Sequence, residues 1–214
     1  MKLVKYNLEQ FIESVDSIQP TPGGGSVSAL VGALGTALVR MVGHLTVGKK
    51  RFLNAPEEEQ QLFFKIIDEL TNTKEELTLL VDEDTNAYNE LVEAYKLPKS
   101  TEAEIKLRNE KIAEGTTKSI NVPYKIALLS FNVLEKIQII LKNGNPNTIS
   151  DLGVAALALS TSIQGAAMNV LINLPGLTNE ELKAGHFEAM KRIISETQKL
   201  TNKLLDSVFQ KLTI

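Results

Sequence analysis

The chain has 214 residues, no cysteine and a formal net charge of -3. The missing cysteines exclude disulfides and thiolate-ligated metal sites, and the near-neutral charge gives no reason to expect a nucleic acid partner. A chain of this length buries roughly 70% of its unfolded surface, and no linker divides it, so we expect one domain over residues 1–214. The N-terminus has no apolar signal core, which favours a cytoplasmic protein.

Helix signals run through the whole chain, and no window shows the sustained alternation of a strand. The first predicted helix covers residues 8–17, with Asn7 as its cap. A loop with three consecutive glycines follows, and Ser26 is expected to cap a second helix that reaches about residue 46. These signals predict an all-α protein.

The second helix, residues 26–46, is rich in glycine, alanine and serine. Each glycine inside a helix costs up to about 1 kcal/mol relative to alanine, so another helix backbone should approach closely there. The helix is apolar on nearly every side, and a symmetric dimer is the expected source of cover. Only Val27–Val39 is free of charge, which is shorter than the ~20 residues of a membrane span, so we expect no membrane partner.

A third, very long helix is predicted from Pro56 to about Lys96. Its apolar stripe has helical spacing and comprises Phe63, Ile66, Leu70, Leu77, Val81, Tyr88, Leu91 and Tyr95. Asp84 falls inside this sector, whereas Asp82 lies near the opposite face. Burial would raise the pKa of Asp84 and suit it to proton transfer near neutral pH. The structural alternative is that Asp84 caps or bridges a neighbouring helix.

Pro123 is expected to kink or break a fourth helix that begins at Thr101. A second small-residue helix reaches about Asn173, and a final helix ends the chain. The predicted fold is an all-α, elongated helical bundle with one very long helix, dimerising through the small-residue helices.

Two clusters at helix ends are candidates for ligand binding. Gly23, Gly24 and Gly25 can present converging backbone N–H groups to an anion or a carbonyl oxygen, although close helix packing explains the glycines almost as well. Lys49 and Lys50 follow the second helix, where they either complement its dipole or anchor a ligand carboxylate.

Three further polar residues lie beside apolar helices. Asn145 and Asp151 precede the second small-residue helix, where capping is the structural explanation. Asn169 stands among apolar neighbours and needs a partner, from the backbone, a side chain or a ligand. His44 and His186 have no companion ligands at helical spacing, so we expect no metal site.

Five motifs occur in this order: Pro20-Thr-Pro-Gly-Gly-Gly-Ser26, Leu45-Thr-Val-Gly-Lys-Lys50, Val81-Asp-Glu-Asp-Thr-Asn-Ala-Tyr88, Gly144-Asn-Pro-Asn-Thr-Ile-Ser-Asp151 and Asn169-Val-Leu-Ile-Asn173. Together they resemble the formimidoyltetrahydrofolate cyclodeaminase and methenyltetrahydrofolate cyclohydrolase family. The resemblance covers nearly the whole chain. The formiminotransferase domain fused to this one in animal enzymes is absent, so the chain looks like the free-standing form.

The resemblance implies an all-α homodimer with a folate substrate, no cofactor and no metal, and with its site at or near the subunit interface. It implies that Asp84 is catalytic. The candidate substrate-binding residues are Gly23, Gly24, Gly25, Ser26, Lys49, Lys50, Asp82, Asn145, Asp151 and Asn169. Among these, Lys49 and Lys50 would attract the glutamate tail of the folate, and Asp82 alone is more often a solvated helix charge.

The resemblance leaves two reactions open. We favour the cyclodeaminase, a lyase of histidine degradation that converts 5-formimidoyltetrahydrofolate to 5,10-methenyltetrahydrofolate and ammonia. The alternative is the cyclohydrolase, which opens the methenyl ring with water to give 10-formyltetrahydrofolate. A second alternative is a non-catalytic helical scaffold, which explains the helices but not an acid in the apolar stripe.

Overall fold

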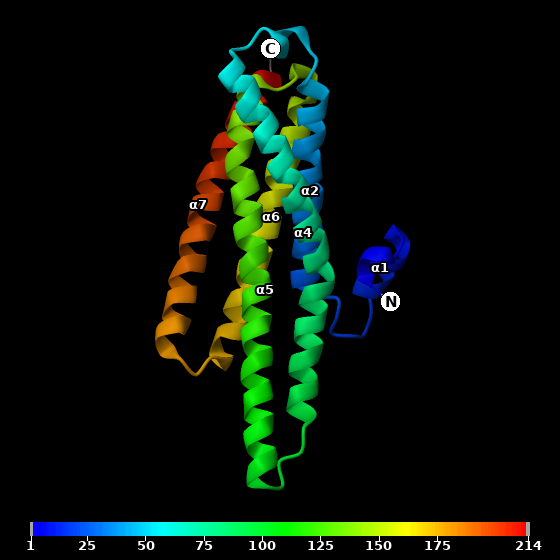
Figure 1. The fold of residues 1–214 in the computed structure, drawn as a ribbon, viewed down its shortest axis with the longest axis vertical. Coiled ribbons are helices and arrows are strands. Elements are labelled where there is room, and N and C mark those ends of the chain that lie inside the picture. Colours follow the sequence, from blue (N-terminus) through cyan, green and yellow to red (C-terminus); the bar gives the residue numbers. More distant parts are fainter. Residues whose placement is uncertain (1, 213–214) are drawn as a thin grey trace.

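Two antiparallel helices, α2 (Gly24–Thr46) and α6 (Ile149–Asn173), pack side by side in an elongated bundle, in a computed structural model that describes residues 2–212 (Figure 1). The described residues contain helices and no strands, which confirms the all-α prediction. The remaining elements are η1 (Leu3–Lys5), α1 (Leu8–Val15), α3 (Lys50–Leu53), α4 (Glu57–Lys96), α5 (Glu102–Asn143), η2 (Pro146–Thr148), η3 (Leu174–Gly176) and α7 (Glu180–Leu212).

The small residues of α2 and α6 bring these helices together within one chain. A Cβ added to Gly32 would lie 2.6 Å from the Ser162 hydroxyl, and one added to Gly35 would lie 2.9 Å from the Leu159 side chain. The predicted close approach of another helix is therefore found, but its partner is α6 of the same subunit. Gly32 and Gly35 thus face α6 of the same chain, and the dimer predicted through these two helices stays a prediction.

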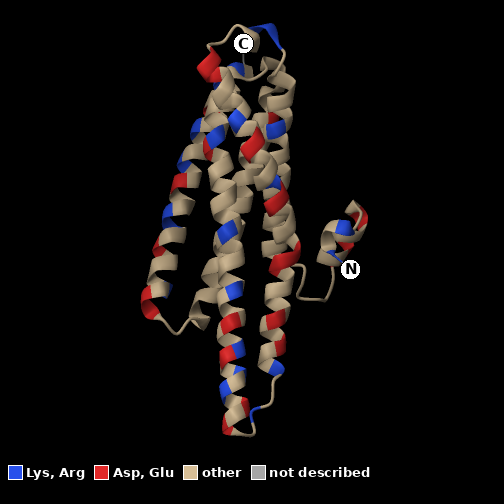
Figure 2. Cartoon of the chain, in the orientation of Figure 1, with Lys and Arg blue, Asp and Glu red and all other residues tan. Residues whose placement is uncertain are grey.

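The opposite faces of α2 and α6 keep rows of large, exposed apolar side chains. These are Leu34, Met41 and Leu45 on α2, and Val154, Leu157, Met168 and Ile172 on α6. Each helix has one charged residue, Arg40 or Asp151, whereas charges are frequent on α4, α5 and α7 (Figure 2). Both helices are long and apolar enough to cross a membrane, but about half of each is buried, as in the core helices of soluble proteins.

The structure has two very long helices instead of the predicted one, because Pro123 does not break α5. Proline removes the N–H that would bond the carbonyl four residues earlier, which here belongs to Ser119. The side-chain amide of Asn173 donates to that carbonyl at 3.0 Å. A neighbouring helix therefore satisfies the acceptor that proline leaves open, and α5 continues through residue 143.

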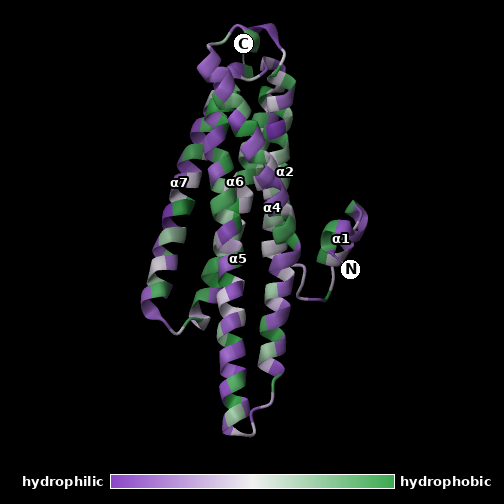
Figure 3. Cartoon of the chain, in the orientation of Figure 1, coloured by the Kyte–Doolittle hydropathy of each residue, from purple (hydrophilic) through white to green (hydrophobic). Residues whose placement is uncertain are grey.

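The apolar stripe of α4 is buried only as far as the other helices accompany it. Leu77 and Val81 are buried, but Tyr88 and Tyr95 are exposed, which corrects their predicted place in the core. Beyond this point α4 and α5 extend past the rest of the bundle as a pair (Figure 1), and this extension is largely hydrophilic (Figure 3). Asp84 lies where the stripe leaves the core.

Candidate active site

The first turn of α2 is capped by a residue of another helix. Gly23 is the N-cap and provides no side chain, so the first backbone N–H groups of α2 need an acceptor from elsewhere. The Asp84 carboxylate, from α4, lies directly over Gly25, where any added Cβ would overlap it. The prediction that Ser26 caps α2 is wrong, because the helix begins two residues earlier and Ser26 lies inside its first turn.

Ser26 links α2 to the acid. Its Oγ lies 2.8 Å from the carbonyl oxygen of Val81 and 3.1 Å from Oδ2 of Asp84. The backbone N–H of Ser26 is a second donor to the same carboxylate. Because glycine leaves room and serine supplies donors, the sequence Gly-Gly-Ser at the start of α2 forms the cradle in which this carboxylate lies.

The electrostatics of Asp84 are set mainly by burial. Desolvation raises the pKa of the Asp84 carboxyl above its ordinary value, and the hydrogen bonds from Ser26 oppose that rise. A carboxylate that only caps a helix has its pKa lowered by the amides it accepts from. Here burial is the larger cause, so the acid holds its proton to higher pH than an exposed aspartate. This is the property that proton transfer near neutral pH requires.

Asn169 connects α6 to the first turn of α2. Its amide lies against Gly24, where an added Cβ would be 3.1 Å from Nδ2. The amide also donates to the carbonyl of Gly165 at 2.8 Å within α6. The first turn of α2, with Gly23 as its N-cap, therefore lies against Asp84 of α4 at Gly25 and Ser26, and against Asn169 of α6 at Gly24.

The other candidate residues lie at the far end of α2. Lys49 and Lys50 follow its last turn and are exposed. The backbone N–H of Asn145 donates to Thr46 Oγ1 at 2.9 Å, and its side-chain amide donates to the carbonyl of Leu45 at 3.2 Å. The 23 residues of α2 separate the two ends by about 35 Å at 1.5 Å per residue. One subunit therefore cannot bring these residues to Asp84.

Two acidic candidates also lie apart from Asp84. Asp151 is in the first turn of α6, at the far end with Asn145. Asp82 accepts a hydrogen bond from the backbone N–H of Leu3 and so fixes the N-terminal segment to α4. Its side chain is on another face of α4 than Asp84, as the helical spacing predicted.

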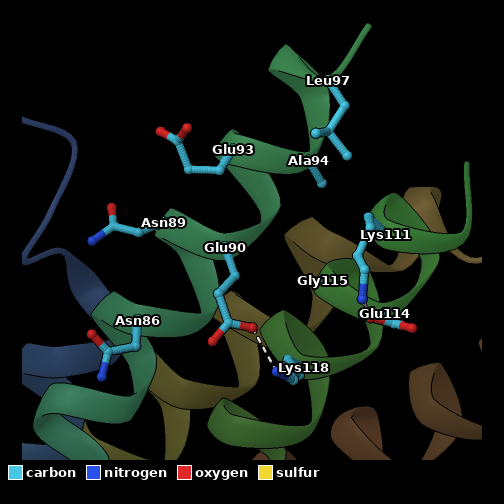
Figure 4. A pocket seen from close by; sticks show the side chains of 10 residues that line it. All are labelled: Asn86, Asn89, Glu90, Glu93, Ala94, Leu97, Lys111, Glu114, Gly115 and Lys118. Carbon is cyan, nitrogen blue, oxygen red and sulfur yellow. Dashed lines mark hydrogen bonds and ion pairs between the residues drawn. The ribbon is translucent and has the colours of Figure 1, made fainter. Parts of the chain in front are cut away.

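A cavity of about 620 Å³ opens between the extended parts of α4 and α5 (Figure 4). Its charged side chains are paired: Lys118 with Glu90, Lys111 with Glu114, and Glu93 with Lys96. Asp84 lines neither this cavity nor the one of about 410 Å³ beside Asp82. The Asp84 side chain is half-buried.

Sequence reasoning missed Thr85. Its hydroxyl lies 3.1 Å from Ser26 Oγ, so it belongs to the same half-buried cluster as Asp84. The available signal was its position four residues after Val81, on the side of α4 that faces α2. A threonine at such a position more often bonds its own helix, as Thr78 bonds the carbonyl of Lys74.

Comparisons with known proteins agree on one family. Residues 7–192 match the family described as formiminotransferase-cyclodeaminase. A methenyltetrahydrofolate cyclohydrolase from Methylorubrum extorquens is 31% identical over 95% of this chain and 96% of that relative. A formimidoyltransferase-cyclodeaminase from Mus musculus is 35% identical over 92% of this chain but 36% of that relative, so the chain spans about a third of its length.

A solved structure has the same fold. The crystal structure of formiminotetrahydrofolate cyclodeaminase from Thermotoga maritima matches with a TM-score of 0.76 and 25% identity, over 97% of this chain and 96% of that one. These relatives are all named as enzymes. The chain is accordingly an enzyme, and the scaffold alternative is set aside.

Proposed function

Because this chain belongs to the formiminotransferase-cyclodeaminase family, we propose that it converts 5-formimidoyltetrahydrofolate to 5,10-methenyltetrahydrofolate and ammonia, with Asp84 as the proton relay. The observation that carries the proposal is the Asp84 carboxyl itself. It is held over Gly25 by Ser26, and burial raises its pKa. The reaction needs no cofactor or metal, and a cytoplasmic location remains our prediction.

The reaction closes a ring within one molecule, so the enzyme has to fix conformation and move a proton. The N10 amine attacks the carbon of the protonated formimino group on N5, and a tetrahedral carbon forms that carries N5, N10 and an amino group. The ionised Asp84 accepts the proton of N10 and returns it to the amino group, which leaves as ammonia. A carboxyl with a raised pKa suits both steps, because it is a stronger base than an exposed aspartate and still releases its proton.

The cyclohydrolase reaction is the second candidate. The match to the methenyltetrahydrofolate cyclohydrolase covers 96% of that relative, so the two chains correspond over almost their whole lengths. In this reaction Asp84 would act as a general base on the attacking water. Both reactions pass through a tetrahedral carbon between N5 and N10, so the same cradle serves either one.

We further propose that the enzyme is a homodimer and that its two subunits share each folate site. The exposed apolar rows on α2 and α6 suit an isologous contact between two copies. A two-fold axis perpendicular to α2 would pair the α2 helices antiparallel. The partner's Lys49 and Lys50 would then approach the Asp84 end, where they could bind the glutamate carboxylates of the folate.

The reaction is identified by incubating the purified protein with each substrate and following the methenyl absorbance band. Growth of the band from 5-formimidoyltetrahydrofolate, with release of ammonia, identifies the cyclodeaminase. Accelerated loss of the band from 5,10-methenyltetrahydrofolate identifies the cyclohydrolase. Absence of turnover with both substrates would reject the proposed function.

A further inference from the structure

Ser26 has a combination of burial and contacts that substrate binding does not explain. The side chain is 0% exposed. Its Oγ has three oxygen neighbours on α4: the Val81 carbonyl at 2.8 Å, Asp84 Oδ2 at 3.1 Å and Thr85 Oγ1 at 3.1 Å. A hydroxyl enclosed in this way cannot touch a ligand while α2 keeps its position. The role that the family resemblance implied for Ser26, contact with the substrate, does not fit this burial.

The three neighbours compete for one proton. A serine hydroxyl donates one hydrogen bond and accepts up to two, so Ser26 can donate to the Val81 carbonyl or to Asp84, but not to both in full. A bond to an ionised carboxylate is roughly twice as strong as one to a neutral acceptor. When Asp84 is ionised, the Ser26 hydroxyl therefore donates its hydrogen bond to the carboxylate. When Asp84 is protonated, the proton can turn to Val81.

We propose that Ser26 is a positioning residue whose hydroxyl alternates between Asp84 and the Val81 carbonyl as the acid loses and regains its proton. Thr85 supports this alternation, because its hydroxyl can donate to Ser26 Oγ while Ser26 donates to the acid. After protonation, the carboxyl itself can donate to Ser26. The carboxyl thus keeps a hydrogen-bond partner in both protonation states and stays over Gly25 throughout.

The surroundings of Asp84 leave this role to Ser26. On α2 and α6 the neighbouring residues are glycine, serine and Asn169, none of which titrates near neutral pH. On α4, Asp82 bonds Leu3 and Glu83 and Tyr88 are exposed. On α5, Lys118 and Lys125 pair with Glu90 and Glu76. The pKa of Asp84 is accordingly raised by burial and lowered by Ser26, with no charged side chain among its causes.

The test compares Ser26→Ala with Ser28→Ala. Ser28 is also buried, on the same helix, but its hydroxyl bonds the Gly24 carbonyl at 2.6 Å and does not contact the acid. Carbon-13 NMR of labelled aspartate reports the titration of Asp84 without substrate, with Asp84→Asn identifying its signal. We expect Ser26→Ala to move this titration upward by about one pH unit, equivalent to about 1.4 kcal/mol, and Ser28→Ala to leave it in place.

The kinetic readout separates positioning from substrate contact, and it rests on the proposed function. In Ser26→Ala the acidic limb of kcat/KM should move upward with the NMR titration, while KM at the optimum stays within about twofold. A raised KM with an unmoved titration would instead make Ser26 a substrate contact and overturn the proposal. If the enzyme lacks folate activity, the NMR experiment still decides the role of Ser26.

Thr85→Val provides an independent variant, because it keeps the side-chain shape and removes only the hydroxyl. We expect about half the upward shift of Ser26→Ala, since the bond from Ser26 to Asp84 remains but loses its supporting donor. This variant decides the matter if Ser26→Ala loses helicity by circular dichroism. Unchanged Asp84 titration in Thr85→Val, or equal shifts in Ser26→Ala and Ser28→Ala, would overturn the proposal.

Discussion

The backbone groups at the two ends of α2 are satisfied in opposite ways, by an acid at the start and by amide donors at the end. At the start of the helix, Gly23 offers no side-chain cap, and the Asp84 carboxylate from α4 fills that role while burial raises its pKa. At the other end, Asn145 donates to the carbonyl of Leu45 and to Thr46 Oγ1, and Lys49 and Lys50 remain exposed. At the first end, the hydroxyl groups of Ser26 and Thr85 are hydrogen-bonded around one acid. At the second end, the lysines stay available to a ligand or a partner.

This contrast suggests that the two ends work together only between subunits. About 35 Å separates them within one chain, which exceeds the reach of side chains around one small substrate. An antiparallel dimer would place each acidic end beside a basic end of the partner.

The largest effect is expected at Asp84. Asp84→Asn removes the proton relay and should lower kcat by at least about 100-fold, within the range for loss of a general acid–base group. Helicity by circular dichroism should be unchanged, because asparagine can still accept from Ser26. The matched control is Glu83→Gln, an exposed acid on the same turn, which should keep full activity. Normal turnover by Asp84→Asn would remove the acid from the mechanism.

The dimer is tested on its proposed apolar face. Leu34→Glu combined with Leu157→Glu places buried charges in the contact and should yield monomers by light scattering. Activity should fall by roughly 10- to 100-fold if the partner completes the site. Leu107→Glu, an equally exposed leucine on the extension of α5, is the control and should stay dimeric. Monomers with full activity would show that one subunit suffices.

The pairing of the two ends is tested by mixing inactive variants. Asp84→Asn and the double variant Lys49→Glu/Lys50→Glu are unfolded together and refolded as mixed dimers. If the ends meet across the interface, half of the dimers are mixed and each regains one intact site. Activity should then recover to about a quarter of the wild-type value at limiting substrate. No recovery above the separate variants means that the lysines do not act across the interface.

The smallest effect concerns stability and pH. Because burial raises its pKa, Asp84 binds its proton more tightly in the folded chain than in the unfolded one. Its contribution to stability is therefore fully present below the unfolded pKa and is lost as pH rises through the folded pKa. Asp84→Asn should melt higher than the wild type at pH 8, by about 2–4 °C, and the difference should shrink toward pH 4. A pH-independent difference would contradict this expectation.

Much of the fold follows from local sequence signals. The capping box of Asn7 and the long stripe that starts near Pro56 gave α1 and α4 correctly, apart from the end of α1 at Val15. Pro123 misled because its compensation is distant in sequence: only the folded chain brings the Asn173 amide to the Ser119 carbonyl. A local rule cannot include a partner that tertiary structure supplies.

The site was predictable only in part, for a similar reason. Helical spacing indicated that Asp84 points inward, and the site was expected where this acid meets the glycine-rich loop around Gly23–Gly25; the structure places the carboxylate against Gly25. The place of Ser26 was wrong by three residues, because Gly23 rather than Ser26 is the N-cap of α2. The length of α2 separates its two ends, yet the family resemblance assigned candidate residues at both ends to one substrate site.

The extension of α4 and α5 beyond the bundle should unfold locally more often than the rest of the molecule. There the backbones meet at Gly115, where an added Cβ would be 2.9 Å from Leu91 Cα, and the ion pair that joins the two helices in this region, Lys118 with Glu90, is exposed. Such pairs contribute little, about 0–1 kcal/mol each. Amide hydrogens near Lys96 and Glu102 should therefore exchange with deuterium through local fraying, long before those at the centre of α6, which are released only when the whole chain unfolds.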